Sequence, residues 1–460
     1  MITFSETGWH GVISDEIGFE TISIVAQAVA DCLNDEFPSD PVVLAYDTRF
    51  LSREYAWSIQ RVLTANRIKV FMHKKPVPTS FLSMSVSSCN AALGIMVTGE
   101  GRPARYSGLI FRFPSGCPVS GEWMDRLFHY LYRRYPRSSE DSRHLLQYID
   151  YFSEYAAELA KNVDVESIRK ANPYITSDSF FGSVGTYMQD LMKFMGLEGI
   201  HIRTKPNPGF MDCVPQPNER NMSPVSRLTV QKNGDIGLFF NGDGSVMGAV
   251  SPQGQIIRNE WAMAVILDEW LQFKGKDFDF YTEIFTPELA HLLLKHHGLE
   301  ALPLHKLKER NRPLDKAVIW DRKGLRFGSF LPDWDAIFQG TLLLQALCRY
   351  DLNWQRFSKH MEVLTAKKIQ EQKLINIDVD LWEEKKKSLL ERVEEITPAG
   401  LDQVIEQGRE IKLVLQDAGW LGFHYNECEK NLFLYYDAEL GQYAENLLVQ
   451  LIGWLTAEDL

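Results

Sequence analysis

The residues of this chain best suited to chemistry lie in a loop near position 100, directly after an apolar run. Residues 91–97 have the length and branched side chains of a buried strand. The loop at 98–105 then brings together two glycines, the carboxylate of Glu100 and the guanidinium groups of Arg102 and Arg105. Folds of the α/β class place ligand sites at the carboxyl ends of strands, so this loop is a candidate site. An ordinary strand-to-turn transition also explains the stretch taken alone, and the rest of the chain must decide.

A second loop with alternating oxygen side chains lies at 241–246. Asn241, Asp243 and Ser245 carry oxygen atoms of the kind that ligate a hard cation. One carboxylate is few for such a site, and Asn-Gly and Asp-Gly pairs between two apolar runs are typical of a β-hairpin. We therefore favour a hairpin over a metal site at this position.

The elements that must position these loops alternate between strands and helices. Helices are expected at 19–33, 54–66, 187–195, 260–273, 286–297 and 334–347, and strands at 41–46, 68–72, 174–176 and 317–320. This alternation predicts βαβ units with mostly parallel sheets. Three further stretches are expected to be helical: an amphipathic bridge at 140–162, a charge-rich solvated linker at 367–395 and a short segment at 398–405. Strands at 411–415, 421–424 and 432–436 and a helix at 443–455 are expected to close the chain.

Length and composition restrict the class of protein. A chain of 460 residues is too long for one hydrophobic core, so several domains are expected. The net charge of −12 argues against nucleic acid as a partner, because phosphate binding needs a basic face. Six cysteines without a C-x-x-C pair are expected to be free thiols in a reducing compartment. We expect no signal peptide, no membrane-spanning run and a cytoplasmic location.

Taken in order, these loops resemble those of the α-D-phosphohexomutase family, the phosphoglucomutases and phosphomannomutases. The phrases that carry the resemblance are 46–52 (YDTRFLS), 76–79 (PVPT), 215–217 (PQP) and 324–335 (GLRFGSFLPDWD). The resemblance implies an α/β fold of four domains around a central cleft. Three similar α/β domains would be followed by a smaller C-terminal α+β domain.

The resemblance also implies domain boundaries and a role for each domain. Domain I would span 1–145 and hold the phosphoserine-loop position, and domain II would span 146–250 and hold the metal-loop position. Domain III would span 251–370 with the sugar-loop position. Domain IV would span 371–460 with the phosphate-loop position.

The first two site loops depart from the family pattern. The phosphoserine motif, Thr-Ala-Ser-His-Asn-Pro, aligns with 98–103, so Glu100 stands where the family serine carries the phosphoryl group and Gly101 where the histidine stands. The magnesium motif, Asp-Gly-Asp-x-Asp-Arg, aligns with 241–246, where two of the three carboxylates and the arginine are missing. An N-terminal arginine of the family is replaced by His10.

The last two site loops depart as well. The sugar loop, usually Gly-Glu-Glu-Ser-Gly, falls near 318–324 and leaves Asp321 as the one candidate carboxylate. The phosphate loop, usually Arg-Pro-Ser-Gly-Thr-Glu-Pro, matches 424–430 and keeps only Glu429. Asn426 and Glu427 would add bulk and negative charge where a phosphate should lie.

Because all four loops depart together, the chain is expected to be a catalytically inactive homologue that binds a metabolite or a protein partner. The family reaction needs a nucleophile that can be phosphorylated, a cation and a sugar-phosphate clamp. The alternative is a hexose-phosphate mutase or related sugar-phosphate enzyme of carbohydrate metabolism with altered chemistry, using Glu100, Asp243 or Asp321 as acid–base groups. If active, it would be an intramolecular phosphotransferase on sugar phosphates.

The site expected from these loops has two parts. Glu100 is expected to be non-catalytic and to act as a fixed negative charge, either balanced by Arg102 or sharing a weak cation site with Asp243. The candidate ligand-binding residues are His10, Arg49, Arg102, Arg105, Asp321, Arg322, Lys323, His424, Asn426 and Glu429. No cofactor is expected, although weak magnesium binding at Asn241, Asp243 and Ser245 is left open. The expected partner is a sugar phosphate, another anionic metabolite or a protein, with neither nucleic acid nor membrane.

Overall fold

The computed structural model describes residues 2, 4, 8–36, 40–139, 142–365, 370–377, 379–396, 401–407, 410–415, 419–426, 431–437 and 441–456. The chain divides into two compact units. Unit 1 comprises Met1–Phe278, Asn311–Val318 and Lys323–His360, and unit 2 comprises Asp279–Arg310, Ile319–Arg322 and Met361–Leu460. The loops at 98–103 and 241–246 therefore belong to unit 1. The four domain boundaries expected from the resemblance stay a prediction.

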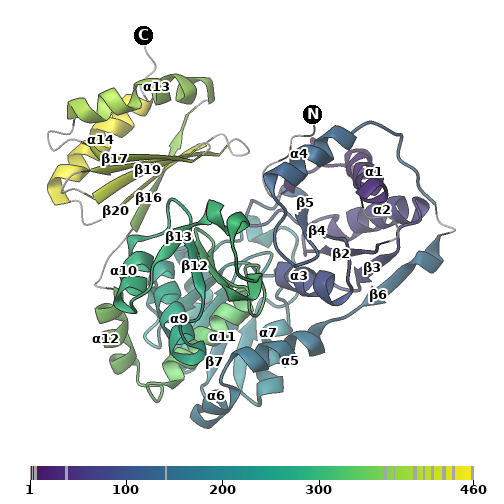
Figure 1. Cartoon of the computed structure of the whole chain (residues 1–460). Coiled ribbons are helices and arrows are strands. Elements are labelled where there is room, and N and C mark those ends of the chain that lie inside the picture. Colours follow the sequence, from purple (N-terminus) through teal and green to yellow (C-terminus); the bar gives the residue numbers. More distant parts are fainter. Residues whose placement is uncertain are drawn as a thin grey trace. The chain divides into compact units, whose positions relative to one another are not determined.

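The N-terminal sheet of unit 1 is six-stranded and mixed (Figure 1). Its strands are β1 (Gly8–Val12), β2 (Val42–Tyr46), β3 (Val70–His73), β4 (Leu93–Val97), β5 (Tyr106–Arg112) and β6 (Leu146–Ile149), in the spatial order β1-β5-β4-β2-β3-β6. Helices α1 (Phe19–Glu36), α2 (Ser52–Ala65), α3 (Thr79–Ser88) and α4 (Gly121–Tyr130) belong to the same part of the chain. Every residue of β2 and β4 is buried, as expected for parallel strands covered on both faces. The strands predicted before the loop at position 98 are confirmed.

The second sheet of unit 1 holds the predicted hairpin. Its strands are β7 (Ile175–Asp178), β8 (Gly199–Ile202), β9 (Ile236–Phe240), β10 (Met247–Val250) and β11 (Ile256–Ile257), in the order β11-β10-β9-β7-β8. Helices α5 (Phe152–Asn162), α6 (Val165–Ala171), α7 (Tyr187–Met195) and α8 (Glu219–Gln231) accompany it. Strands β9 and β10 are antiparallel with Met247 opposite Phe240, so the hairpin predicted at 241–246 is confirmed.

The third segment again alternates helices and strands. It contains α9 (Asn259–Lys274), β12 (Asp279–Thr282), α10 (Glu288–His296), β13 (Ala301–Pro303), β14 (Ala317–Asp321), β15 (Gly324–Phe327), α11 (Ala336–Cys348) and α12 (Trp354–Thr365). Within unit 2, β12 and β13 pair in parallel. Within unit 1, α9 packs against α11, and every residue of α11 is buried. Short 3-10 helices lie at Arg143–Leu145, Phe210–Asp212, Leu304–Glu309 and Leu314–Lys316.

The C-terminal part of unit 2 is an antiparallel sheet with helices. Its elements are β16 (Gln370–Asn376), α13 (Val379–Ile396), β17 (Leu401–Gln407), β18 (Glu410–Leu415), β19 (Gly419–Asn426), β20 (Asn431–Asp437) and α14 (Gly441–Thr456), with the strand order β16-β20-β19-β18-β17. Both helices lie on one side of this sheet (Figure 1). Its core is a cluster of buried side chains from the sheet and both helices that includes Trp382, Phe423 and Leu451.

Three secondary-structure predictions are wrong in part or whole. The stretch 140–162 is not one helix, because 146–149 forms β6 beside β3 and the helix begins only at Phe152. In the stretch 367–395, residues 370–376 form β16, which pairs with β20, and the described helix begins at Val379. The short helix expected at 398–405 is replaced from Leu401 by β17, which pairs with β18. In each case pairing with a distant strand overrides the local pattern.

Candidate functional site

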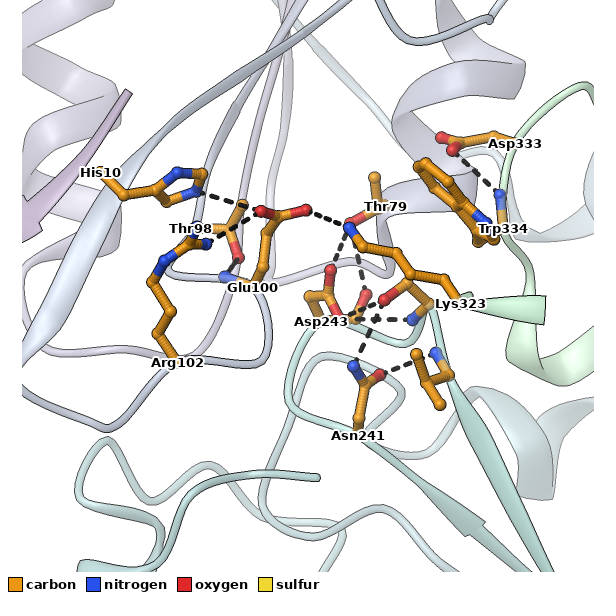
Figure 2. Close-up of polar contacts among 12 residues, drawn as sticks. His10, Thr79, Thr98, Glu100, Arg102, Asn241, Asp243, Lys323, Asp333 and Trp334 are labelled. Atoms are coloured by element: carbon orange, nitrogen blue, oxygen red, sulfur yellow. Dashed lines mark hydrogen bonds and ion pairs between the residues drawn. The ribbon is translucent and has the colours of Figure 1, made fainter. Parts of the chain in front are cut away.

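The candidate site of unit 1 is built around the carboxylate of Glu100, in the turn that follows β4. Glu100 has a positive φ of 52°, and its backbone N–H donates a 2.8 Å hydrogen bond to the hydroxyl oxygen of Thr98. Lys323 Nζ lies 2.6 Å from Glu100 Oε1, and Arg102 Nη1 lies 3.0 Å from Oε2. His10 Nε2, from β1, lies 3.4 Å from the same Oε2. Figure 2 shows the carboxylate between His10 and Arg102 on one side and Lys323 on the other.

Glu100 is a permanently ionised group at neutral pH. Its burial alone would raise its pKa, but the nearby charges, that of Lys323 first, hold the pKa of this carboxyl well below its usual range. Burial, helped by the charge of Arg102, lowers the pKa of His10 to about 3. His10 is therefore neutral at pH 7, and its contact with Glu100 is a neutral polar contact. Two cations, Lys323 and Arg102, balance the single carboxylate.

We expect His10 to make the protein sensitive to acid. The pKa of His10 in the folded state, about 3, lies below its unfolded value, so between pH 6.5 and 3 the unfolded state takes up a proton that the folded state does not. Stability attributable to His10 is thus lost as the pH falls through this range. Between pH 7 and 5.5 the free energy of unfolding should fall by about 1 kcal/mol from this group.

The measurement is urea denaturation at these two pH values. A His10→Gln variant should show a drop that is smaller than that of the wild type by this amount. His305→Gln, at an exposed histidine, is the matched control and should behave like the wild type. An unchanged pH dependence in His10→Gln would contradict the assignment.

Arg49 is buried under the loop at 98–106 and binds its backbone, so its guanidinium group is not free to bind an external anion. Its Nη2 donates to the carbonyl oxygens of Glu100 at 2.6 Å and Arg102 at 2.7 Å. Its Nη1 donates to the carbonyl oxygens of Pro103 at 2.8 Å and Tyr106 at 3.1 Å. Only 3% of Arg49 is exposed. Four backbone acceptors on one guanidinium group make this arginine the template of the loop at 98–106.

Lys323 is placed by the segment that follows it. Gly324 adopts a φ of 134°, which side chains disfavour, and turns the chain into β15. The ammonium group of Lys323 lies 4.5 Å from the ring centroid of Trp334. The backbone N–H of Trp334 donates to Asp333 at 2.9 Å (Figure 2). Arg112 Nε in turn donates to Asp333 at 2.6 Å. The loop after β4 and the residues 323–334 therefore meet through Glu100 and Lys323.

The hairpin loop at 241–246 forms a closed set of hydrogen bonds. Asp243 Oδ1 accepts from the hydroxyl of Ser245 at 2.7 Å, and Asp243 Oδ2 accepts from that of Thr79 at 3.3 Å. Asn241 Nδ2 donates to Ser245 Oγ at 3.3 Å, and its Oδ1 accepts from the N–H of Val246 at 3.0 Å. Burial, with the charge of Glu100, raises the pKa of Asp243.

The oxygen atoms of the loop at 241–246 do not fit a magnesium ion as ligands. Magnesium prefers several carboxylate or water oxygens in near-octahedral geometry, and this loop offers one carboxylate whose two oxygens already accept hydrogen bonds. Among the described residues, no group of three or more histidine, cysteine, aspartate or glutamate side chains is placed to hold a metal.

Gly101 leaves room for a side chain from another loop. A Cβ atom at position 101 would collide with the side-chain amide of Gln216, which packs directly over this glycine. Gln216, in the phrase 215–217, thus occupies the space that a side chain at position 101 would need.

We expect Gly101→His to destabilise the protein by about 1 kcal/mol, because the imidazole must displace the half-buried, flexible side chain of Gln216. Combining it with Gln216→Ala should recover part of the loss. Thermal and urea denaturation measure both variants, and Gly121→His, at a helix start with open space around it, is the control. Equal stability of Gly101→His and the wild type would refute the packing argument.

The remaining candidates are found in other places. Arg105 is exposed, with its guanidinium 5.5 Å from the ring centroid of Tyr106. In unit 2, Arg322 is paired with Glu283 and Glu410, and the buried Asp321 precedes it.

The phosphate-loop position is described only at its start. His424 Nδ1 lies 3.1 Å from Glu410 Oε1, and Asn426 ends strand β19. Glu429 lies outside the described residues.

Sequence reasoning gave no role to several polar residues that build these sites. Thr79 and Gln216 lie within two of the phrases that carry the resemblance, which is the one signal they offered. Thr98 matches the first residue of the phosphoserine motif that aligns with 98–103, whereas Glu283 and Glu410 had no signal beyond their residue type. Among the residues that the structure describes, no helix is both long and apolar enough to cross a bilayer.

Comparison with protein-family models matches two parts of the chain. Residues 1–133 match the model described as "Phosphoglucomutase/phosphomannomutase, alpha/beta/alpha domain I", and residues 153–254 match the corresponding domain II. Together these matches cover just over half of the chain. A phosphoglucomutase/phosphomannomutase of Thermococcus kodakarensis is 23% identical over 303 residues, which cover 65% of this chain and 66% of that relative. The match therefore spans just under two thirds of the relative's own length.

Solved structures match over nearly the whole chain. A phosphoglucomutase/phosphomannomutase family protein of Burkholderia thailandensis has a TM-score of 0.78 at 18% identity, covering 99% of this chain and 98% of its own. The N-acetylphosphoglucosamine mutase of Aspergillus fumigatus, in complex with GlcNAc-6P and magnesium, has a TM-score of 0.57 at 10% identity, covering 98% and 95%. Likenesses at these identities show a shared fold, the four-domain architecture of the phosphohexomutases.

Proposed function

Because the chain belongs to the phosphoglucomutase/phosphomannomutase family, we propose that it is a phosphohexomutase-like protein in which a fixed carboxylate replaces the transferable phosphoryl group. On this proposal it does not carry out the phosphoserine-dependent mutase reaction. The observation that carries the proposal is the ionised, buried carboxylate of Glu100, held by Lys323 at 2.6 Å and Arg102 at 3.0 Å.

The chemistry of Glu100 supports this proposal. A hydroxyl can accept a phosphoryl group and return it, whereas a carboxylate forms only a labile acyl phosphate. A carboxyl with a strongly lowered pKa is also a weak nucleophile and a weak base. Both of its oxygens are already engaged, Oε1 by Lys323 and Oε2 by Arg102 and His10. Glu100 therefore supplies a constant negative charge to the loop.

A sugar phosphate, or another anionic metabolite, is the ligand class that we propose for this protein. The support is the shared fold with the Aspergillus fumigatus enzyme, which was solved with GlcNAc-6P and magnesium. Binding is expected to be weak, because Lys323, Arg102 and Arg322 each already pair with a carboxylate of the chain. We propose that binding needs no magnesium, since the loop at 241–246 does not fit it. The alternative that the sequence leaves open is that the protein binds a protein partner instead of a metabolite.

The second candidate function is a hexose-phosphate mutase or related sugar-phosphate enzyme with altered active-site chemistry. The names of the relatives, which are mutases, support this candidate at least as well as inactivity. Asp243 would be its acid–base group, because burial raises the pKa of that carboxyl while Glu100 stays ionised.

The free cysteines at 32, 89, 117, 213 and 348 support the proposal of a reducing, cytoplasmic location.

The experiment that separates the two candidates is a coupled mutase assay. Glucose 1-phosphate, mannose 1-phosphate and glucosamine 1-phosphate are each supplied with the bisphosphate activator and magnesium, and calorimetry with the same compounds measures binding. The proposal expects no turnover above a heat-killed sample and weak binding that magnesium does not change. Turnover above that control, lost in Asp243→Asn, would establish the second candidate. If the protein shows neither turnover nor binding of these compounds, the result would point to a protein partner.

A further inference from the structure

An aromatic ring from the loop after β12 is seated in the C-terminal sheet of unit 2. Phe285 is fully buried and stacks against Tyr435, with ring centroids 5.0 Å apart and an interplanar angle of 18°. Trp420 stacks on it at 6.3 Å and 11°. Gly422 lies opposite Tyr435 in the sheet, and a Cβ atom there would come within 2.5 Å of the Phe285 ring. The sheet therefore has a glycine-lined recess that fits this ring.

A network of charged side chains lies beside the seated ring. Arg322 Nε lies 2.8 Å from Glu283 Oε1, and the backbone N–H of Arg322 donates to the same oxygen at 2.6 Å. Arg322 Nη2 lies 2.9 Å from Glu410 Oε1, which His424 Nδ1 approaches to 3.1 Å. The guanidinium carbon of Arg322 lies 5.8 Å from the ring centroid of Phe285. One arginine thus joins the loop after β12 to strand β18.

The network holds more carboxylates than cations of fixed charge. Arg322 faces Glu283 and Glu410, and the buried Asp321 precedes it in the chain. Burial raises the pKa of Glu283 to about 7, and the charges of Asp321 and Glu410 add to this rise although Arg322 opposes it. Both bonds from Arg322 to Glu283 end on Oε1, so a proton on Oε2 breaks neither of them.

The other titratable groups near this network lie on α10 and the C-terminal strands. The hydroxyl of Tyr435 hydrogen-bonds to Arg322, and its pKa is raised by burial. Lys412, on β18, lies 4.2 Å from the ring centroid of Trp420. Burial, with the charge of Lys412, lowers the pKa of His291 on α10. Lys412 thus contacts the ring of Trp420, whereas among the described residues Arg322 is the cation paired with Glu283.

We propose that these contacts form a proton-sensitive clasp, made of Glu283, Phe285 and Arg322 on one side and strands β18–β20 on the other, which tightens when Glu283 is protonated. The sign follows from linkage. The closed clasp holds a proton on Glu283 up to about pH 7, whereas an opened, solvated Glu283 releases it near its ordinary value of 4.5. Between these values a rise in pH favours opening, and above about pH 7 the effect levels off.

The test is hydrogen exchange on the full chain at pH 5.5 and pH 8, with rates corrected for the intrinsic pH dependence of exchange. Peptides covering 279–286 and 419–426 report on the clasp, and peptides covering 93–97 serve as the internal reference. Protection of the clasp peptides should fall by about tenfold or more between these pH values, relative to the reference. Glu283→Gln mimics the protonated side chain, so its protection should be high at both pH values. The exposed Glu288→Gln is the matched control and should behave like the wild type.

Two outcomes would overturn the clasp. A pH dependence that survives in Glu283→Gln would assign the effect to another group. Clasp peptides that are equally protected at both pH values in the wild type would refute the proton sensitivity itself. Gly422→Ala tests the aromatic seat separately, because its methyl group occupies the space of Phe285 and should lower protection at both pH values. Unchanged protection in that variant would remove the seated ring from the proposal.

Discussion

A Glu100→Ser variant is expected to lose about 2 kcal/mol of stability and to gain no phosphoglucomutase turnover. The change restores the family hydroxyl but leaves Lys323 and Arg102 without their shared carboxylate, and removing one partner of a partly buried pair leaves an uncompensated charge. The figure is below that of a fully buried pair because 36% of the Lys323 side chain is exposed. Urea denaturation measures the loss, and the coupled assay with glucose 1-phosphate, the bisphosphate activator and magnesium measures turnover.

Activity should stay absent because groups that act as a unit do not recover one at a time. In Glu100→Ser the loop at 241–246 still offers a single carboxylate, and Gln216 still fills the space over Gly101. Adding Lys323→Met should recover part of the stability, since it removes a cation that has lost its contact with Glu100. Turnover by Glu100→Ser above the wild type would show that the other loops are more competent than their contacts suggest. If Glu100→Ser were as stable as the wild type, the ion pairs of Glu100 with Lys323 and Arg102 would not stabilise the protein.

The surroundings of Glu100 could be predicted from the sequence only where they are local. The loop after an apolar run, and Arg102 as one balancing charge, follow from the residues at 93–102, and Arg102 does lie 3.0 Å from the carboxylate. The stronger contact comes from Lys323, 223 positions away. The resemblance brought Lys323 into the site as a candidate anion binder, but nothing in the local pattern names its partner. Whether it binds an external anion stays a prediction.

The same limit applies to Arg322 and to β6. Arg322 was predicted to bind an anion, and the structure pairs it with Glu283 and Glu410, two carboxylates from distant segments that carry no motif. The aromatic spacing in 140–162 suits a helix, yet 146–149 completes the edge of a sheet beside β3. Strand partners and ion-pair partners are chosen by tertiary packing, which a local pattern does not encode. The hairpin at 241–246 was predictable because its turn residues are contiguous.

An Arg49→Met variant is expected to lose more stability than any other single change considered for unit 1, about 4 kcal/mol. The methionine retains much of the apolar stem but removes the donors to four backbone carbonyls, at Glu100, Arg102, Pro103 and Tyr106.

Arg49 also has a buried acidic partner. Arg49 Nε lies 3.2 Å from Asp47 Oδ2, and both side chains are fully buried, so the substitution leaves an uncompensated charge in the interior. Arg49→Lys keeps the charge but not the planar fork, so it should lie between Arg49→Met and the wild type.

The comparison with Arg53 separates a template role from a general loss of charge. Arg53, four residues further along the chain, pairs with Glu54 at the surface, and Arg53→Met should cost less than 0.5 kcal/mol or so. Urea denaturation gives the three stabilities, and hydrogen exchange of peptides covering 98–106 should rise in Arg49→Lys, which is the variant expected to stay folded. If Arg49→Lys were as stable as the wild type with the same exchange at 98–106, the four carbonyl bonds would not hold this loop. The position of Glu100 would then depend on its ion pairs with Lys323 and Arg102 and on its backbone hydrogen bond to Thr98.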